Sequence, residues 1–509
     1  MTNRGPTAAI RLPAMAFLRS RHVMWLVPVG VFVVVRRGPP ERIELACVAT
    51  TVVGVILLVR ARPKGAVIFL LAFAPLQVVI LAALYRIGLP EAAVQQLHYW
   101  KEYVVAGLAL VAARHWAASG RRVDLLDKVL LAYVVGTTLY LLAPWLLGRD
   151  SEAVSVYTRS VAWRNLVLYV VLFLVVRHGP FDERTKRRAG DVVLVVGGIM
   201  AGVTIFEFLA SSSWNQFAVN TLHVPELRRD IFNITTGNPF DLRTYGTVGD
   251  QLVVRPGSVV FDPLTAGFDM ILPLAVGVER ILRNRGRTHI QVVTAACALA
   301  ILLTQTRSAI IAAAAVVALA IAALPGRSEA SRARFALGFV AVVIVLVPIT
   351  ISTGVAARVL GGDSTSTEEH RARLLEGLDT VAREPLGLGL GTAPDSNQRL
   401  ERGRPVITEN YYLQVAVEVG VLNMGLFMTL VFLMLRGTKR ATRGDESALT
   451  GAVFAAGVGL SVGGLFLHVW AGTETALVYW AAAGLAIAGP DRSPAVHHLY
   501  DRRRRTAIT

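Results

Sequence analysis

The sequence contains only two cysteines and carries little charge for its length. Charged residues make up 17% of its 509 residues, whereas soluble proteins carry about 25%. This deficit excludes a soluble domain of any size. Cys47 and Cys297 lie in apolar stretches far apart in the sequence, so we expect neither a structural disulfide nor a thiolate metal site.

Hydrophobic residues make up 54% of the chain and form stretches long enough to cross a bilayer. A span needs roughly 20 apolar residues, and its backbone must bond within its own helix. The pattern therefore predicts an all-α polytopic membrane protein with a bundle of about 12–14 transmembrane helices. We place fourteen spans at residues 24–35, 43–59, 65–85, 103–113, 129–147, 161–176, 192–210, 264–282, 290–304, 308–324, 335–352, 412–435, 449–467 and 475–488.

The basic residues predict the orientation of these spans. Arg36 and Arg37 follow the first span where a signal-peptide cleavage site would require small residues, so we interpret it as a retained span. With both termini cytoplasmic, most of the 52 lysines and arginines fall on the cytoplasmic side. We therefore read the net charge of +17 as a topology signal and a contact for membrane lipids, and not as a nucleic-acid-binding surface.

Two predicted outside loops are too long to be simple connectors. The chain is predicted to begin with N-terminal transmembrane helices at 1–210, an extracytoplasmic loop at 211–263 and transmembrane helices at 264–352 with a short turn at Arg307. An extracytoplasmic loop at 353–411, C-terminal transmembrane helices at 412–489 and a basic cytoplasmic tail at 490–509 follow.

The second loop contains an amphipathic pattern over residues 368–383, which Pro385 ends. Arg371, Leu375 and Leu378 share one stripe at helical spacing. We expect a surface helix that rests on the membrane with its apolar side down and with Arg371 pointing toward the bundle. The alternative is that Arg371 contacts lipid headgroups.

Two more arginines fall on the same predicted side. Arg307 lies in a very short turn between two apolar helices, where an arginine is costly unless it faces a cavity or a partner. Arg255 shortly precedes the span at 264–282. The alternatives are snorkelling for Arg307 and an ordinary loop position for Arg255.

Together with Arg371, these two arginines suggest a diphosphate site, because guanidinium groups bind phosphate in a bidentate way. The outer loops show no paired carboxylates for magnesium, so we expect no metal and no cofactor.

A candidate general base closes the second loop. Glu409 opens the segment Glu-Asn-Tyr-Tyr-Leu at the start of a span, where a carboxylate can accept a proton from a hydroxyl group. The alternative is an acidic residue that only stabilises the start of a helix. His370, His468 and Glu474 also lie on the outer side and are alternative bases.

Four segments together resemble the superfamily of O-antigen ligases and O-antigen polymerases, which are bacterial membrane glycosyltransferases. They lie at residues 255–267, 303–308, 371–391 and 409–421. The resemblance implies inverting, metal-independent transfer of a glycan from a polyprenyl diphosphate carrier to a hydroxyl group of a glycan or lipid acceptor. The reaction would take place on the outer face of the bacterial plasma membrane.

The resemblance also implies roles for individual residues. Arg255, Arg307 and Arg371 would bind the diphosphate, Glu409 and His370 would be catalytic, and Asn410 and Tyr411 would contact substrate. Ligases often carry His-Asn where this chain has Glu409-Asn410. That departure leaves open both the identity of the base and the choice between ligase and polymerase.

Three other functions fit a polytopic chain. A flippase for lipid-linked oligosaccharides, or another transporter, would show related halves or broken helices with polar residues at midplane. A transferase that uses a polyprenyl monophosphate sugar commonly has an acidic pair in a long first outer loop, and here Glu41 is the sole acid of that short loop. A non-enzymatic envelope scaffold would have no need for inward-facing arginines.

Overall fold

The computed structural model describes residues 62–119, 123–144, 154–232, 245–248, 251–283, 287–323, 364–393, 406–442 and 447–488, together with a few isolated positions. The predicted spans at 24–35, 43–59 and 335–352 and the predicted tail at 490–509 lie outside these ranges.

The helices of the N-terminal half are α4 (Pro63–Phe73), η1 (Ala74–Leu76), α5 (Gln77–Arg86), α6 (Glu91–His98), α7 (Trp100–Ser119), α8 (Leu125–Leu142), α9 (Val156–His178) and α10 (Glu183–Leu209). The predicted first loop contains α11 (Ser211–Gln216), η3 (Phe217–Thr221), α12 (Val224–Asp230), β1 (Tyr245–Val248), β2 (Gln251–Val254) and η4 (Ser258–Val260). The second half contains α13 (Pro263–Asp269), α14 (Ile271–Leu282), α15 (Thr288–Leu303), α16 (Arg307–Ala322), α19 (Ser364–Arg383), α20 (Tyr411–Ala441), α21 (Ala448–Gly463) and α22 (Thr473–Ile487).

The predicted fold class, an all-helical membrane protein, is confirmed. β1 and β2 form a short antiparallel hairpin inside the predicted first loop. Five helical segments in the described part of the chain are long and apolar enough to cross a membrane: Pro63–Arg86, Leu125–Leu142, Val156–His178, Glu183–Leu209 and Tyr411–Ala441. Four shorter apolar helices accompany them. Each of the other predicted spans inside the described ranges falls on one or two helices.

Small residues bring the helices of the bundle together. A side chain at Gly459 in α21 would meet the Ala312 carbonyl of α16 at 2.6 Å, and one at Gly484 in α22 would meet the Phe173 carbonyl of α9 at 2.8 Å. Without a hydrophobic driving force in lipid, helices associate through such close packing. The α16–α21 and α9–α22 contacts are among the most extensive in the molecule.

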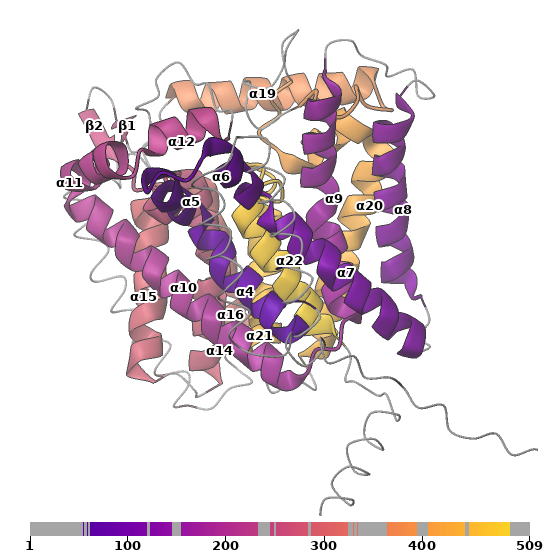
Figure 1. Ribbon diagram of the computed structural model, residues 1–509, viewed down its shortest axis with the longest axis horizontal. Helices are drawn as coiled ribbons and strands as arrows, with labels where there is room; N and C mark the ends of the chain where they lie inside the picture. Colours follow the sequence, from indigo (N-terminus) through magenta and orange to yellow (C-terminus); the bar gives the residue numbers. More distant parts are fainter. Residues whose placement is uncertain are drawn as a thin grey trace, which may run out of the picture.

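One end of the bundle is covered by a helix that lies across it. Figure 1 shows α19 running roughly perpendicular to α8, α9 and α20, with α11, α12 and the hairpin at the same end. We call this the capped end. The predicted helix at 368–383 is therefore present as α19, and it ends at Arg383 as the following Pro385 predicts.

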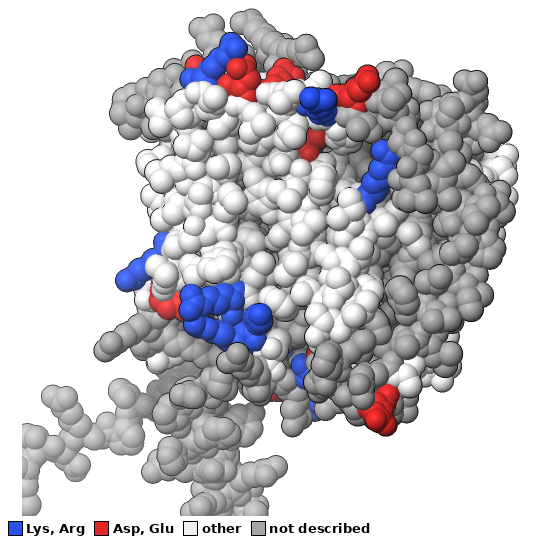
Figure 2. Space-filling model, turned by 180° about the vertical axis from the view of Figure 1, so that it is seen from behind, with Lys and Arg blue, Asp and Glu red and all other residues white. Residues whose placement is uncertain are grey.

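Charge separates the two ends of the molecule. Figure 2 shows a broad uncharged face between charged residues at the two ends, with both signs at the capped end and mostly Lys and Arg at the other. Lys64 and Arg280 belong to the opposite end, where they pair with Asp182 and Asp191 at 2.6 Å each. An uncharged belt between two polar ends is what a bilayer requires.

Candidate functional site

Arg255 lies against the short turn that joins α15 to α16. Its Nε donates to the Thr304 carbonyl oxygen at 3.3 Å, and the Gln305 side-chain amide donates to the Val254 carbonyl oxygen at 2.8 Å. Gln305 adopts a left-handed backbone conformation with φ 53°, which reverses the chain within three residues. Arg307 follows as the first residue of α16. The segment at 255 and the segment at 303–308 are therefore in direct contact.

The same turn also holds the start of α13. The Thr306 hydroxyl donates to the Pro263 carbonyl oxygen at 2.9 Å. A side chain at Gly267 would meet both Ala309 and the Thr304 hydroxyl oxygen at 3.0 Å, so glycine permits the close approach of α13 to α16. These contacts fix Arg307 relative to the loop that carries Arg255.

The third and fourth segments meet at a break in α20. Val419 and Gly420 leave the helical conformation, with φ 80° at Gly420. The chain after α19 fits into this break: the Leu388 amide donates to the Val417 carbonyl at 2.6 Å, and the Gly389 amide donates to the Glu418 carbonyl at 3.1 Å. Backbone groups freed by the break are thus satisfied by protein, as a membrane-embedded chain requires.

Gly420→Ala tests this docking. A Cβ at Gly420 would lie 3.0 Å from the Leu386 carbonyl group, and φ 80° disfavours any L side chain. We expect a loss of stability of about 1–3 kcal/mol, measured as a lower Tm of the detergent-solubilised protein. Gly425→Ala is the matched control, because it lies in the same helix with nothing within 4 Å, and we expect it to raise the Tm slightly. Equal shifts in both variants would contradict the docking.

Glu409 holds α19 to the bundle. Its carboxylate contacts Arg373 and the Nδ1 atom of His370, both on α19. Glu409 is 15% exposed, whereas His370 is 47% exposed and presents its ring to solvent. Glu409 has φ 47°, a conformation that is sparsely populated for residues other than glycine, asparagine and aspartate. The structure therefore brings the two predicted catalytic residues into contact.

Asn410 and Tyr411 fix the start of α20. The Asn410 side chain accepts from the Leu413 amide at 3.0 Å as a helix N-cap and donates to the Leu465 carbonyl at 3.0 Å. Tyr411 is 1% exposed and packs against Phe427. These contacts give both residues a structural role, and the substrate contact expected from the sequence stays a prediction.

Arg371 differs from the expectation in its orientation. Its side chain is exposed, together with Leu375 and Leu378 of the same stripe. The face of α19 that turns toward the bundle carries Arg373 and Gly377, where a side chain would meet Thr408 at 3.0 Å. The expected inward position of Arg371 is therefore wrong. The helical spacing grouped the residues of α19 correctly, but the face that contacts the bundle is the one with Arg373 and not the one with Arg371.

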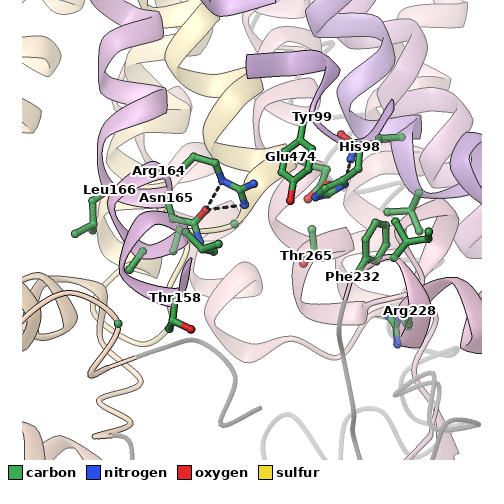
Figure 3. A pocket seen from close by; sticks show the side chains of 18 of the residues that line it. His98, Tyr99, Thr158, Arg164, Asn165, Leu166, Arg228, Phe232, Thr265 and Glu474 are labelled. Atoms are coloured by element: carbon green, nitrogen blue, oxygen red, sulfur yellow. Dashed lines mark hydrogen bonds between the residues drawn. The ribbon is translucent and has the colours of Figure 1, made fainter. Parts of the chain in front are cut away.

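A polar cavity of about 290 Å³ lies between the two halves of the chain. Figure 3 shows Arg164 and Asn165 of α9 on one side and Tyr99, His98 and Glu474 across from them. Gln414 and Glu418 of α20 also line it, and both are almost fully buried. Among the described residues that line the cavity, none is one of the seven site residues predicted from the sequence.

The charged groups of the cavity are held in place by neighbours. Arg164 pairs with Glu102 at 3.3 Å and lies 6.0 Å from the centre of the Tyr99 ring. Arg228 donates to the Phe261 carbonyl oxygen at 2.7 Å. Burial and a hydrogen bond with Tyr157 raise the pKa of Tyr99 to about 12, so its hydroxyl keeps its proton.

The four segments thus form two contacting pairs, 255–267 with 303–308 and 371–391 with 409–421. Residues 292–430 match the O-antigen ligase family. The resemblance predicted from the sequence is confirmed over this stretch. No curated protein matches the chain.

The O-antigen ligase match implies a membrane enzyme with glycosyltransferase-like activity on lipid-linked glycans. The matched stretch contains the predicted residues Arg307, His370, Arg371 and Glu409, as well as Asn410 and Tyr411. Arg255 precedes the matched stretch but contacts its α15–α16 turn. The N-terminal half lies outside the match and supplies one wall of the cavity.

Among the residues that line the cavity, sequence reasoning named only Glu474 as a candidate, as an alternative base, because the cavity is built from distant parts of the chain. One signal was present: Arg164 lies within the predicted span at 161–176, and Lys101 lies just before another. A charged residue at membrane depth indicates a functional or paired site. Lys101 is fully buried, and its Nζ donates to the Gln77 side chain at 3.5 Å.

Proposed function

We propose that this protein transfers a glycan from a polyprenyl diphosphate carrier to a hydroxyl group of a glycan or lipid acceptor. The observation that supports this most is that four separate sequence segments form two contacting pairs near the capped end, and that three of these segments lie within the O-antigen ligase match. Such convergence of distant polar segments onto one end of an apolar bundle is typical of an active site.

The capped end faces the outside of the bacterial plasma membrane in this proposal. Lys and Arg gather at the opposite end (Figure 2), and basic residues are retained on the cytoplasmic side. The reaction therefore takes place at the outer surface, where lipid-linked glycans are present after their transfer across the bilayer.

Arg255 and Arg307 bind the diphosphate. They lie beside one turn, Arg255 directly after β2 and Arg307 at the start of α16. Guanidinium groups remain charged at any relevant pH and bind phosphate oxygens in a bidentate way. Arg371 on the exposed face of α19 contacts the carrier from above. The arginines stabilise the negative charge that grows on the leaving group, which is the role that magnesium has in metal-dependent sites.

His370 and Glu409 act as a pair. Glu409 contacts Nδ1 of His370 and thereby orients the ring, as a carboxylate orients histidine in other enzymes. The other ring nitrogen, Nε2, takes the proton of the acceptor hydroxyl while its oxygen attacks the anomeric carbon. The bond from that carbon to the diphosphate breaks, the electron pair leaves with polyprenyl diphosphate, and the configuration inverts. The histidine that ligases often carry at position 409 is thus replaced by one on α19.

A flippase is the second candidate, because α20 is broken at Val419–Gly420 and broken helices are typical of transporters. Deletion of the gene, followed by mass spectrometry of polyprenyl-linked glycans, separates the two. We expect the lipid-linked donor to accumulate on the outer face, where an added glycosidase can reach it. Accumulation confined to the inner face would contradict transfer and favour flipping.

A further inference from the structure

The cavity between the two halves of the chain is lined by several hydrogen-bond acceptors. The Oε1 atom of Gln414 is buried and has no hydrogen-bond partner among the residues that the structure describes, and Gln414 is 5% exposed. The carboxylates of Glu418 and Glu474 line the same cavity. The amide oxygen of Gln414 only accepts hydrogen bonds, so the ligand that completes this wall must bring a donor.

Other residues that line the cavity bring donors and aromatic faces. Arg164 donates to the Asn165 side chain at 3.2 Å and pairs with Glu102, so its orientation is set before any ligand arrives. Tyr99 and Phe232 present rings to the same space. Aromatic faces carry partial negative charge and attract the C–H edges of a ring.

The charge balance of the cavity favours a neutral ligand. Two arginines, Arg164 and Arg228, stand against the carboxylates of Glu418 and Glu474, and behind the lining Glu102 pairs with Arg164 while Lys101 bonds to Gln77. An anionic ligand would therefore meet no excess of positive charge in the cavity. A small neutral molecule with several hydroxyl groups meets every requirement, because each hydroxyl both donates and accepts.

We propose that this cavity binds one sugar ring of a glycan substrate. The inference rests on the proposed transfer reaction and adds a subsite to it that does not use the diphosphate-binding arginines. The volume of about 290 Å³ lies just below the roughly 300–1,000 Å³ of sites for drug-sized ligands, which suits a single ring. Val260 of η4 and Thr265 of α13 line the cavity, and Pro263 at the start of α13 contacts the turn that precedes Arg307, so we place the ring beside that turn.

The test measures sugar binding directly on the full-length protein in phospholipid nanodiscs, which avoids sugar-based detergents. The probes are the methyl pyranosides of glucose, galactose, mannose and N-acetylglucosamine, observed by saturation-transfer NMR. We expect at least one probe to bind saturably and Gln414→Leu to weaken its binding at least tenfold. Gln216→Leu, at an exposed glutamine of α11, is the matched control and should bind as the wild type does. Failure of all four probes, or equal binding by Gln414→Leu, would overturn the proposal.

Two further variants keep the outcome decisive. If Gln414→Leu does not fold, Glu474→Gln has almost the same shape and removes one acceptor charge, and we expect the same tenfold loss. Arg307→Ala should retain sugar binding while it loses transfer, which separates a failure of this subsite from a failure of the proposed reaction. In transfer assays of Gln414→Leu, a raised KM for the donor or for the acceptor identifies which of the two glycans occupies the cavity.

Discussion

Replacing Arg307 with alanine should lower the rate of glycan transfer by about 10²–10³-fold, the usual effect of removing one donor that stabilises transition-state charge. Arg307 begins α16 beside the turn that Arg255 contacts, and diphosphate leaves with growing negative charge. The measurement is the initial rate of transfer by purified protein with lipid-linked donor. Arg307→Lys should recover only part of the rate, because lysine binds phosphate as a point charge and not as a fork.

The matched control for this prediction is Arg383→Ala. Arg383 lies at the end of α19, is 76% exposed and pairs with Asp379 at 3.0 Å, and exposed pairs of this kind contribute little. We expect its rate to equal that of the wild type. An Arg307→Ala variant that folds, inserts and transfers at the wild-type rate would remove Arg307 from the reaction.

Replacing His370 with glutamine should lower the transfer rate by about 10²–10⁴-fold, the range attributed to a positioned general base. Glutamine keeps the polarity of the site but cannot take up a proton. Glu409→Gln should lower the rate as well, because the ring of His370 then loses its charged orienting partner. KM should change little in either variant, since both act on the chemical step.

Arg373→Ala distinguishes chemistry from attachment of α19. Arg373 contacts the same carboxylate, so its loss weakens the hold of α19 on the bundle and leaves the histidine–glutamate contact in place. We expect a smaller loss of rate than in His370→Gln. If all three variants lost activity equally and also lowered the Tm equally, Glu409 would be a structural anchor and His370 would not be the base.

The fold could be predicted from the sequence because the bilayer restricts the secondary structure of a chain that crosses it. Apolar stretches of spanning length have only the helix available to them, and each predicted span in the described ranges is helical. The end of α19 followed from Pro385, which disfavours helix at the preceding residue. The break in α20 was not foreseen, because Gly420 is one glycine among many and its partner segment lies some thirty residues away.

The candidate site was accessible only where its residues are close in sequence. Arg307 and Glu409 stood out because each is a charged residue at the edge of an apolar span. The choice between Arg371 and Arg373 was not fixed by spacing, since opposite faces of α19 carry an arginine each and only tertiary packing selects the inner face. The cavity brings together Arg164, Gln414 and Glu474, which are sixty or more positions apart in the sequence. No local sequence pattern indicates such a contact.

The most direct test is reconstitution of the protein in nanodiscs with a polyprenyl diphosphate-linked glycan and a hydroxyl acceptor, in the presence of EDTA. The products are the free carrier and the extended acceptor, both quantified by mass spectrometry. The proposed reaction predicts one polyprenyl diphosphate released for each glycan transferred, with both products formed about 10²–10³-fold more slowly by Arg307→Ala. An intact donor after incubation of the wild-type protein with a competent acceptor, or transfer that Arg307→Ala supports at the full rate, would contradict it.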